Sequence, residues 1–298
     1  MEAADLTKSA PRRSAGRRLA DLFHGRPRLQ VGGLLAAPLG WLVVLYLGSL
    51  AVLLVAALWT VGAVSGEIER TLSLDNFDTL VQEPVYRTIA GRTILIAALV
   101  TITDALLAFP IAFYMAKVAS PRVRAALLVA VVMPLWSFYL VKVYAWRTML
   151  STGGVLNWLL DPFGIQGPGY GNVAVWLVES YLWLPFMIIP IYAGLERIPN
   201  SLLSASEDLG ASPFTTFRRV ILPLTFPAVV AGSIFSFSLT LGDYITPSLV
   251  SNNQFLGNVV YNNITVNPPL ASAYAVVPIV VMVAYLLIAR RLGAFEHL

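Results

Sequence analysis

The sequence predicts an all-α integral membrane protein with six transmembrane helices and both termini in the cytoplasm. Of the 298 residues, 57% are hydrophobic and 12% are charged, about half the charged share of a soluble domain. The mean hydropathy is +0.74, and six segments each offer the roughly 20 mostly apolar residues that a helix needs to cross a bilayer. These figures exclude a disordered chain, a nucleic-acid-binding domain and an ordinary soluble enzyme.

The six spans divide the chain into a tail, one separate helix and a larger core. In chain order the predicted spans are 33–60, 93–116, 125–146, 173–195, 220–242 and 270–289. The first apolar stretch is far longer than that of a cleavable signal peptide, so it is expected to stay as an anchor. We expect a basic tail at 1–32, a first helix at 33–60, an extracytoplasmic loop at 61–88, a five-helix core at 89–291 and a short tail at 292–298.

The orientation follows from the distribution of Lys and Arg. Seven of the 20 lie in the first 28 residues, and the positive-inside rule keeps such a tail in the cytoplasm. Alternation of the spans then places eight more on the same side: Lys117, Arg122, Arg124, Arg197, Arg218, Arg219, Arg290 and Arg291. The extracytoplasmic loop 244–269 has no charge, and 75–80 is interpreted as a short amphipathic segment on that surface.

The cytoplasmic connection 196–225 is longer than a simple turn and is predicted to be structured. A short helix over 201–209 is capped by Asn200 or Ser201, and Gly210 then takes the position where positive φ costs least. Ser212 and a proline start a second short helix that reaches about residue 221, and Leu222-Pro223 is expected to end it.

This connection also carries an apolar ridge, which allows two interpretations. The ridge is formed by Leu202, Leu203, Leu209, Phe214 and Phe217. A rigid, capped and partly apolar loop suits docking of a soluble partner. The alternative is a pair of interfacial helices on the inner leaflet, and composition leaves the two about equal.

The spacing of the same loop resembles the EAA motif, EAA-x3-G-x9-I-x-L-P, of permease subunits of binding-protein-dependent ABC transporters. The matching residues are Ser204, Ala205, Ser206, Gly210, Val220, Leu222 and Pro223, with a close match over Asp208, Leu209, Gly210, Ala211 and Ser212. Ser204 stands where the motif has Glu. Glu207 lies one helical turn further on, where it either substitutes for that Glu or forms a capping box with Ser204.

From about residue 89 onward the chain is similar to the spermidine/putrescine branch of these permeases, over 144–160, 241–247 and 257–258. The resemblance implies a type I ABC importer permease fold in a bacterial inner membrane. It implies four partners besides the bilayer: a second homologous permease, two cytoplasmic ATPases and an extracytoplasmic substrate-binding protein. It also implies that the ATPases contact a coupling loop made of Leu203, Ser204, Ala205, Glu207, Asp208, Leu209, Gly210, Ala211, Phe214, Leu222 and Pro223.

Four charged residues interrupt or border the spans, where charge is expensive. Asp104 lies in the middle of a span, and an internal pair with Lys142 is one interpretation. Glu179 and Asp243 lie nearer the outer side and are candidates to line the translocation pathway, as Asp104 and Lys142 are if they do not pair. Tyr181, Trp183 and Tyr244 form either an interfacial aromatic belt or faces that hold a cationic substrate.

The sequence argues against an enzyme. It has no Cys, and its two His lie near the two ends, so neither a catalytic nor a metal site is apparent. It contains no Gly-Lys pair and therefore no phosphate-binding P-loop, so no cofactor is expected and ATP is left to a partner subunit. Polyamine import is the predicted function. The alternatives are an ABC permease for another small solute and, with less support, a self-sufficient secondary transporter, for which the related halves expected of many such folds are not found.

Overall fold

The computed structural model describes residues 27–62 and 65–291, so most of the predicted basic tail and the whole C-terminal tail 292–298 lie outside the described residues. The chain divides into two compact units, 1–55 and 56–298. In the first unit, α2 (Pro27–Trp41), the π-helical turn η1 (Leu42–Leu47) and α3 (Gly48–Ala56) follow one another. The 23 residues Leu34–Ala56 are long and apolar enough to cross a membrane, in agreement with the first predicted span.

The second unit begins with a small hairpin and a short helix. Strands β1 (Thr60–Val61) and β2 (Ile68–Glu69) pair antiparallel, with Thr60 opposite Glu69. Helix α4 (Asp75–Gln82) coincides with the predicted amphipathic segment. Its Leu80 is buried in an apolar cluster that includes Tyr274 of the last helix, so its apolar side is covered by the bundle.

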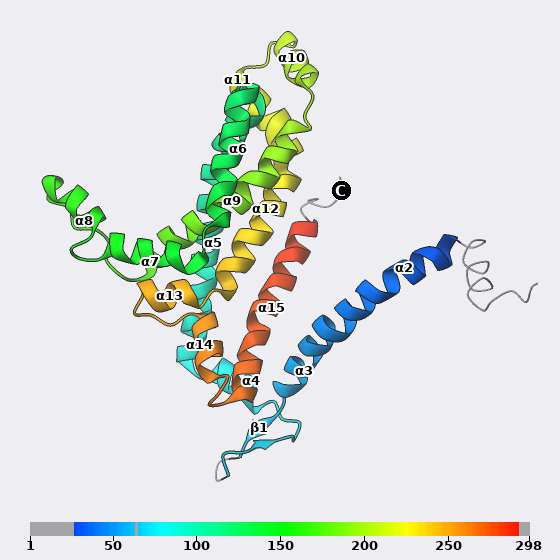
Figure 1. The fold of residues 1–298 in the computed structure, drawn as a ribbon, viewed down its shortest axis with the longest axis vertical. Coiled ribbons are helices and arrows are strands. Elements are labelled where there is room, and N and C mark those ends of the chain that lie inside the picture. The colour runs from blue at the N-terminus through cyan, green and yellow to red at the C-terminus, as the bar shows by residue number, and fades with distance from the viewer. Residues whose placement is uncertain (1–26, 63–64, 292–298) are drawn as a thin grey trace, which may run out of the picture. The chain divides into compact units, whose positions relative to one another are not determined.

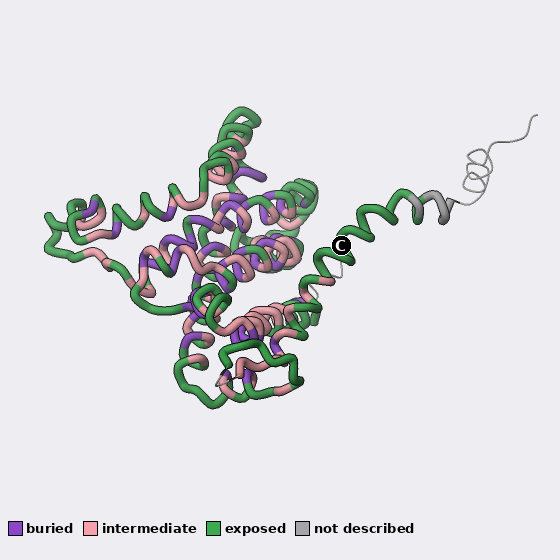
Figure 2. Tube along the Cα trace, turned by 60° about the horizontal axis from the view of Figure 1, so that its bottom comes forward, coloured by how far each residue is buried: buried purple, intermediate pink, exposed green. Residues whose placement is uncertain are grey.

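Three long helices form the centre of this unit: α5 (Pro84–Phe113), α9 (Asn172–Glu196) and α12 (Leu222–Gly242). The π-helical turn η2 (Tyr114–Val118) extends α5, and α15 (Pro268–Arg291) packs on α12 and on α14 (Figure 1). Buried positions recur along the central helices (Figure 2). Helices α9 and α12 approach so closely that a Cβ at Gly194 would lie 2.5 Å from the Ala228 methyl carbon, the kind of contact for which membrane helices use small residues.

The predicted span 125–146 is not one straight helix, which corrects the sequence interpretation. It is divided into α6 (Pro121–Trp136) and α7 (Tyr139–Leu150), which meet at 93°. Ser137 and Phe138 between them are extended, and Pro134 lies in the last turn of α6, where a proline weakens the helix. The described residues therefore contain five helices able to span a membrane, or six if the bent pair counts as one.

The boundary predicted at Leu222-Pro223 is also wrong. After α10 (Asn200–Asp208), the segments α11 (Pro213–Thr216), η4 (Phe217–Ile221) and α12 run on as one 30-residue helix, Pro213–Gly242. The turn η4 is π-helical and ends just before Leu222-Pro223. A π-turn shifts the hydrogen-bond register, which accommodates a proline that has no N–H to donate.

Four further short elements lie in the remaining connections. They are α8 (Val155–Leu160), the 3₁₀ turn η3 (Asp161–Phe163), α13 (Ile245–Val250) and α14 (Leu256–Asn263). Helices α13 and α14 fall inside the uncharged loop 244–269. They bring that loop against α7, α9 and α5, and α13 follows directly on the end of α12.

Candidate functional site

Two regions at opposite ends of α12 contain most of the predicted site residues. The first is the hairpin formed by α10 and α11, residues 200–216, which we call the hairpin. The second is a cavity at the other end of α12, which we call the Asp243 cavity. It is lined by Tyr139, Trp183, Ser238, Leu239, Gly242, Asp243 and Tyr244.

Local backbone chemistry fixes the bend of the hairpin. Gly210 has φ +75°, and its N–H donates to the Glu207 carbonyl at 2.8 Å, while the N–H of Ala211 donates to the Ser206 carbonyl at 3.0 Å. Nested bonds of this kind, around a residue with positive φ, close the end of a helix. The Ser212 hydroxyl then accepts from the Thr215 N–H at 3.3 Å and caps α11, as the sequence predicts.

The two sides of the hairpin differ in what they cover. Leu209 is 88% exposed and Phe214 70%, so these predicted docking residues have no cover in the described chain. Leu203, predicted to share that role, instead packs against the buried cluster that contains Ile198 and Ile221. The exposed apolar residue beside it on α10 is Leu202.

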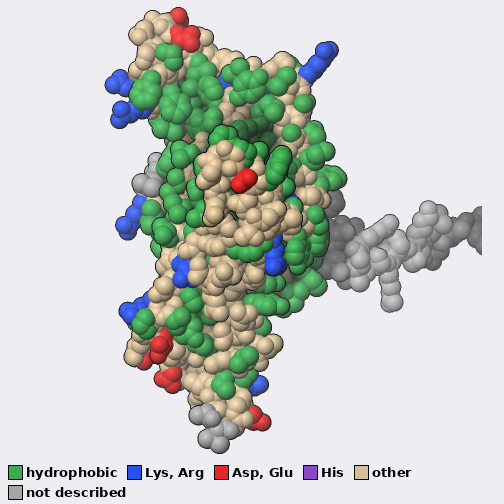
Figure 3. All heavy atoms as spheres, turned by 90° about the vertical axis from the view of Figure 1, so that its left-hand side faces the viewer, with side chains coloured by type: hydrophobic (Ala, Val, Ile, Leu, Met, Phe, Trp, Pro, Cys, Tyr) green, Lys and Arg blue, Asp and Glu red, His purple; other side chains and the backbone are tan. Residues whose placement is uncertain are grey.

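The other hairpin positions are mostly exposed and polar. Ser204, Ala205, Glu207 and Asp208 are exposed, and Ala211 is half-buried. No Glu207 side-chain bond to Ser204 is found in the described structure, and Ser206 instead joins the hydroxyl of Thr216 at 2.8 Å. Acidic side chains are visible at this end of the molecule, with basic ones near them, and further acidic ones lie at the opposite end (Figure 3).

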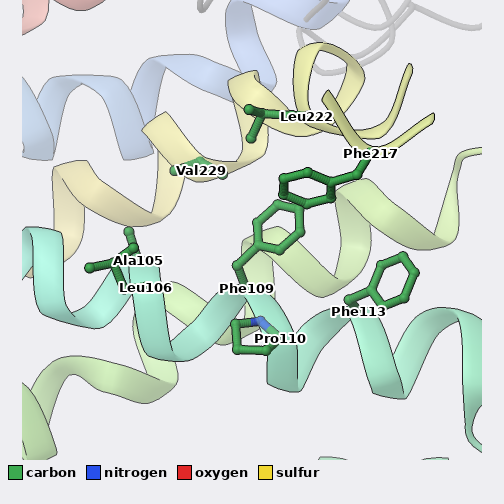
Figure 4. Close-up of a pocket in the computed structure, with 8 residues that line it drawn as sticks. All are labelled: Ala105, Leu106, Phe109, Pro110, Phe113, Phe217, Leu222 and Val229. Atoms are coloured by element: carbon green, nitrogen blue, oxygen red, sulfur yellow. The ribbon is translucent and has the colours of Figure 1, made fainter. Parts of the chain in front are cut away.

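Leu222 lies in an apolar groove next to the hairpin. The groove has a volume of about 500 Å³ and is lined by α5 and the α11–α12 helix. Phe109 and Phe217 meet edge to face in it, with ring centres 5.4 Å apart (Figure 4). Every lining side chain is apolar, so this groove offers no polar side chain to a charged solute.

The Asp243 cavity has a volume of about 320 Å³, and three aromatic residues and one carboxylate, Asp243, are among the residues that line it. The rings of Tyr139 and Trp183 stack with centres 6.0 Å apart. Tyr244 stacks on Tyr261 at 4.5 Å. No Lys or Arg lines the cavity among the described residues.

Asp243 is held in place by backbone and hydroxyl donors. Its Oδ1 accepts from the N–H of Ile245, the first residue of α13, at 2.8 Å, and its Oδ2 accepts from the Tyr139 hydroxyl. The same hydroxyl lies 2.8 Å from Oγ1 of Thr246. The carboxylate is thereby oriented by α7 and α13 at once.

Glu179, a predicted candidate to line the translocation pathway, lies behind the stacked Tyr139 and Trp183 rings and is fully buried. One of its oxygens accepts from the indole N–H of Trp183. The other has no hydrogen-bond partner in the described structure, and neither has the buried hydroxyl of Thr240. Asp243 is close enough to interact electrostatically with Glu179, and no salt bridge to either carboxylate is found among the described residues.

Asp104 and Lys142 do not pair with each other, which excludes one of the two interpretations of these residues. Asp104 is fully buried and accepts from Ser236 of α12 at 2.6 Å, while its second oxygen has no partner in the described structure. Lys142 donates to the Pro134 carbonyl at 3.1 Å, where a cation favourably meets the negative end of α6. The 93° bend between α6 and α7 places Lys142 close to the end of α6.

The sequence made Tyr181 a candidate for the pathway and did not single out Tyr139. In the structure Tyr181 packs against Trp146, with ring centres 5.5 Å apart, and is not among the residues that line the Asp243 cavity. Tyr139 contacts Asp243, Thr246 and Trp183. No local sequence signal identifies it, because its position depends on the 93° bend before it.

Comparison with known proteins agrees with this architecture. Residues 89–295 match the family described as binding-protein-dependent transport system inner membrane component. An inner membrane ABC transporter permease protein, YdcU of Escherichia coli (strain K12), is 41% identical over 97% of this chain and 98% of its own. The spermidine/putrescine transport system permease protein PotB of Haemophilus influenzae is 33% identical over 69% of this chain and 74% of its own.

Solved structures share the fold at low identity. A chain of a bacterial alginate ABC transporter in complex with its pentasaccharide-bound periplasmic protein has a TM-score of 0.70 at 16% identity, covering 91% of this chain and 98% of that one. A chain of the MetNI methionine ABC transporter in an inward-facing conformation has a TM-score of 0.54 at 17% identity, covering 71% of this chain and 97% of that one. The fold is therefore that of a type I ABC importer permease.

These matches remove the enzyme and the self-sufficient secondary transporter from consideration, since ATP is hydrolysed by a separate ATPase in this class of transporter. Location in an inner membrane follows from the same relatives and from the apolar helices. The chain belongs to the family of inner membrane permease components of binding-protein-dependent ABC transporters.

Proposed function

We propose that this permease, paired with a second homologous permease, forms the pathway for ATP-driven import of polyamines such as spermidine or putrescine. The hairpin docks on one of two cytoplasmic ATPases, and a substrate-binding protein delivers the polyamine from the other side. The Asp243 cavity carries the substrate assignment, because it joins a carboxylate to aromatic faces. The likeness to a permease named for spermidine and putrescine supports it.

The chemistry of the cavity suits a polyamine. Such a molecule carries two or more ammonium groups on a methylene chain. Asp243 offsets one positive charge, and the faces of Trp183 and Tyr139 attract cations through their ring electrons. A pathway for an anion would be expected to present Arg or Lys instead.

Buried Glu179 also favours binding of a cation in the cavity. Burial makes a charge on Glu179 expensive without a partner, and two neighbouring carboxyl groups are costly to ionise together. Neither has a Lys or Arg partner among the described residues. An ammonium group entering the cavity lowers the cost of charge on both groups, and its departure restores that cost.

Charge also supports the orientation. Lys117 and Arg124 lie at the hairpin end of the bundle, where Lys117 reaches Ile198 and Arg124 reaches Glu196. Arg218 and Arg219 lie in η4 at the same end. By the positive-inside rule this end faces the cytoplasm, where an ATPase is found, and the Asp243 cavity then faces the binding protein.

The test is uptake of labelled spermidine by proteoliposomes that contain the full complex, its binding protein and internal ATP. We expect saturable, ATP-dependent uptake in which unlabelled putrescine competes and sugars or inorganic anions do not. Saturable uptake of a sugar or an anion without competition by polyamines would overturn the substrate assignment and leave the permease assignment intact.

A further inference from the structure

Two basic side chains tie the base of the hairpin to the neighbouring turn between η2 and α6. The connection from α9 to α10 runs through Arg197, Ile198 and Pro199, and Ile198 is buried. The ammonium group of Lys117, at the end of η2, donates to the Ile198 carbonyl at 2.6 Å. It also lies 3.4 Å from Oδ1 of Asn200, the first residue of α10.

Arg124 makes a second bridge between the same two turns. From the first turn of α6, its Nε donates to the Met115 carbonyl at 3.0 Å and its Nη2 to the Ala116 carbonyl at 3.3 Å. Its Nη1 lies 3.5 Å from Oε1 of Glu196, the last residue of α9, and that oxygen also accepts from the Tyr192 hydroxyl at 3.1 Å.

These contacts connect four helix ends: the end of η2, the start of α6, the end of α9 and the start of α10. The carbonyls that Lys117 and Arg124 bind come from helix ends or turns, which lack partners within their own helix. A charged donor makes a stronger hydrogen bond than a neutral one. Apolar contacts join the same parts, because Leu203 of the hairpin packs on the cluster that includes Ile198 and Met115.

We propose that Lys117 and Arg124 are positioning residues that fasten the base of the hairpin to α5 and α6, so that movement of the hairpin displaces α5 and α9 together. This rests on the proposed docking of the hairpin on an ATPase. Helix α9 carries Glu179 and Trp183, and α5 carries Asp104, so the fastening joins the site of ATPase contact to the polar groups inside the bundle. Without the contacts of Lys117 and Arg124, the hairpin still docks, but it moves relative to α5 and α9 instead of displacing them.

The experiment measures the ratio of polyamine taken up to ATP hydrolysed in the reconstituted full complex. Lys117→Met keeps the length of the side chain and removes its charge and its donors. We expect assembly and ATP hydrolysis to persist while the ratio falls at least about fivefold, and Lys117→Arg to recover most of it. Arg122→Met is the matched control, because Arg122 lies in the same turn, is exposed and makes no hydrogen bond or ion pair within the described structure.

A distance measurement separates positioning from a loss of stability. The chain has no Cys, so cysteines introduced at Ser201 and Val123, both exposed, can be spin-labelled without background from this subunit. We expect one narrow distance distribution with and without nucleotide in the otherwise unchanged chain, and a broad one in Lys117→Met. If Lys117→Met prevents assembly, Glu196→Gln decides, because it removes only the ion pair to Arg124 and should lower the ratio by about half.

An unchanged ratio and a narrow distribution in Lys117→Met, or an unchanged ratio in Glu196→Gln where Lys117→Met does not assemble, would overturn the proposal. Failure of the substrate assignment would look different. The unmodified complex would then take up no spermidine, yet the spin-label distances and ATP hydrolysis stimulated by the binding protein would still report on the fastening.

Discussion

The hairpin and the Asp243 cavity differ in whether their polar groups have hydrogen-bond partners. In the hairpin, the backbone donors around the bend find partners through Gly210, Ser212 and neighbouring carbonyls, and apolar side chains are left exposed. In the cavity region, the aromatic side chains that line the cavity are partly buried, and buried oxygens of Glu179 and Thr240 have no partner in the described structure. The first arrangement suits a rigid surface that binds protein, and the second suits a pathway that holds a charged solute for a short time.

Gly210→Val tests the rigid side of this comparison and should have the largest effect on transport. A residue with a Cβ in the left-handed region costs roughly 1–2 kcal/mol, and a β-branched one is a genuine outlier there. A Cβ at Gly210 would meet no atom within 4 Å, so the penalty comes from the backbone alone. We expect ATP-coupled uptake to fall to about a tenth or less, since about 1.4 kcal/mol corresponds to a factor of ten.

The control for that change is Gly153→Val. Gly153 is exposed and has no positive φ, and a Cβ added there would meet no atom within 4 Å. Membrane insertion should be normal in both variants, as judged by the amount of protein recovered from membranes. Uptake by Gly210→Val equal to that of the unmodified complex would show that the bend is not needed for coupling.

Asp243→Asn and Glu179→Gln test the other side. Both keep the shape of the side chain, and the Asn retains an acceptor for the Ile245 N–H that begins α13. Hydrogen bonds to charged groups contribute about 1.5–3 kcal/mol, so loss of the charge should reduce spermidine uptake roughly tenfold while assembly is retained. The control Asp161→Asn, at an exposed position, should take up spermidine normally. If its uptake fell as much as that of Asp243→Asn, the cavity would have no special role.

Leucines on the two sides of the hairpin should separate docking from folding. Leu203 is partly buried, so Leu203→Ala should cost less than the roughly 2–5 kcal/mol of a fully buried leucine and should still lower the melting temperature of the purified permease. Leu209→Ala removes an 88% exposed side chain and should change stability by less than about 0.5 kcal/mol. We expect Leu209→Ala instead to weaken binding of the ATPase, and the reverse pattern would contradict the assignment of the two faces.

The smallest effect on transport is expected from the mid-bundle contact between Asp104 and Ser236, which is tested through stability. Ser236→Ala leaves both oxygens of buried Asp104 without a partner in the described structure, at a cost of about 1–3 kcal/mol. Ser238, two residues nearer the end of α12, is only half-buried and bonds a carbonyl of its own helix, so Ser238→Ala should cost less than about 0.5 kcal/mol. Equal melting temperatures for the two variants would show that the Asp104 contact does not hold α5 to α12.

Features that depend on neighbours in the chain could be predicted from the sequence alone. Apolar length identified the membrane helices, and Gly210, Ser212 and Pro213 determined the hairpin bend and the start of α11, because positive φ, capping and a fixed proline φ are local properties. The match of 89–295 to the permease family agrees with the resemblance of the hairpin motif.

The packing of the helices decided which polar groups meet. The extended Ser137 and Phe138 turn α7 by 93°, which brings Tyr139 to Asp243 and takes Lys142 to the end of α6 rather than to Asp104. The packing of Leu203 on the bundle and the contacts of Lys117 and Arg124 likewise depend on the ends of α5 and α9 lying next to each other. The bonds from Lys117 to Ile198 and from Tyr139 to Asp243 join residues 81 and 104 positions apart. A chain-local pattern carries no information about such contacts, because each is set by the packing angles of several helices at once.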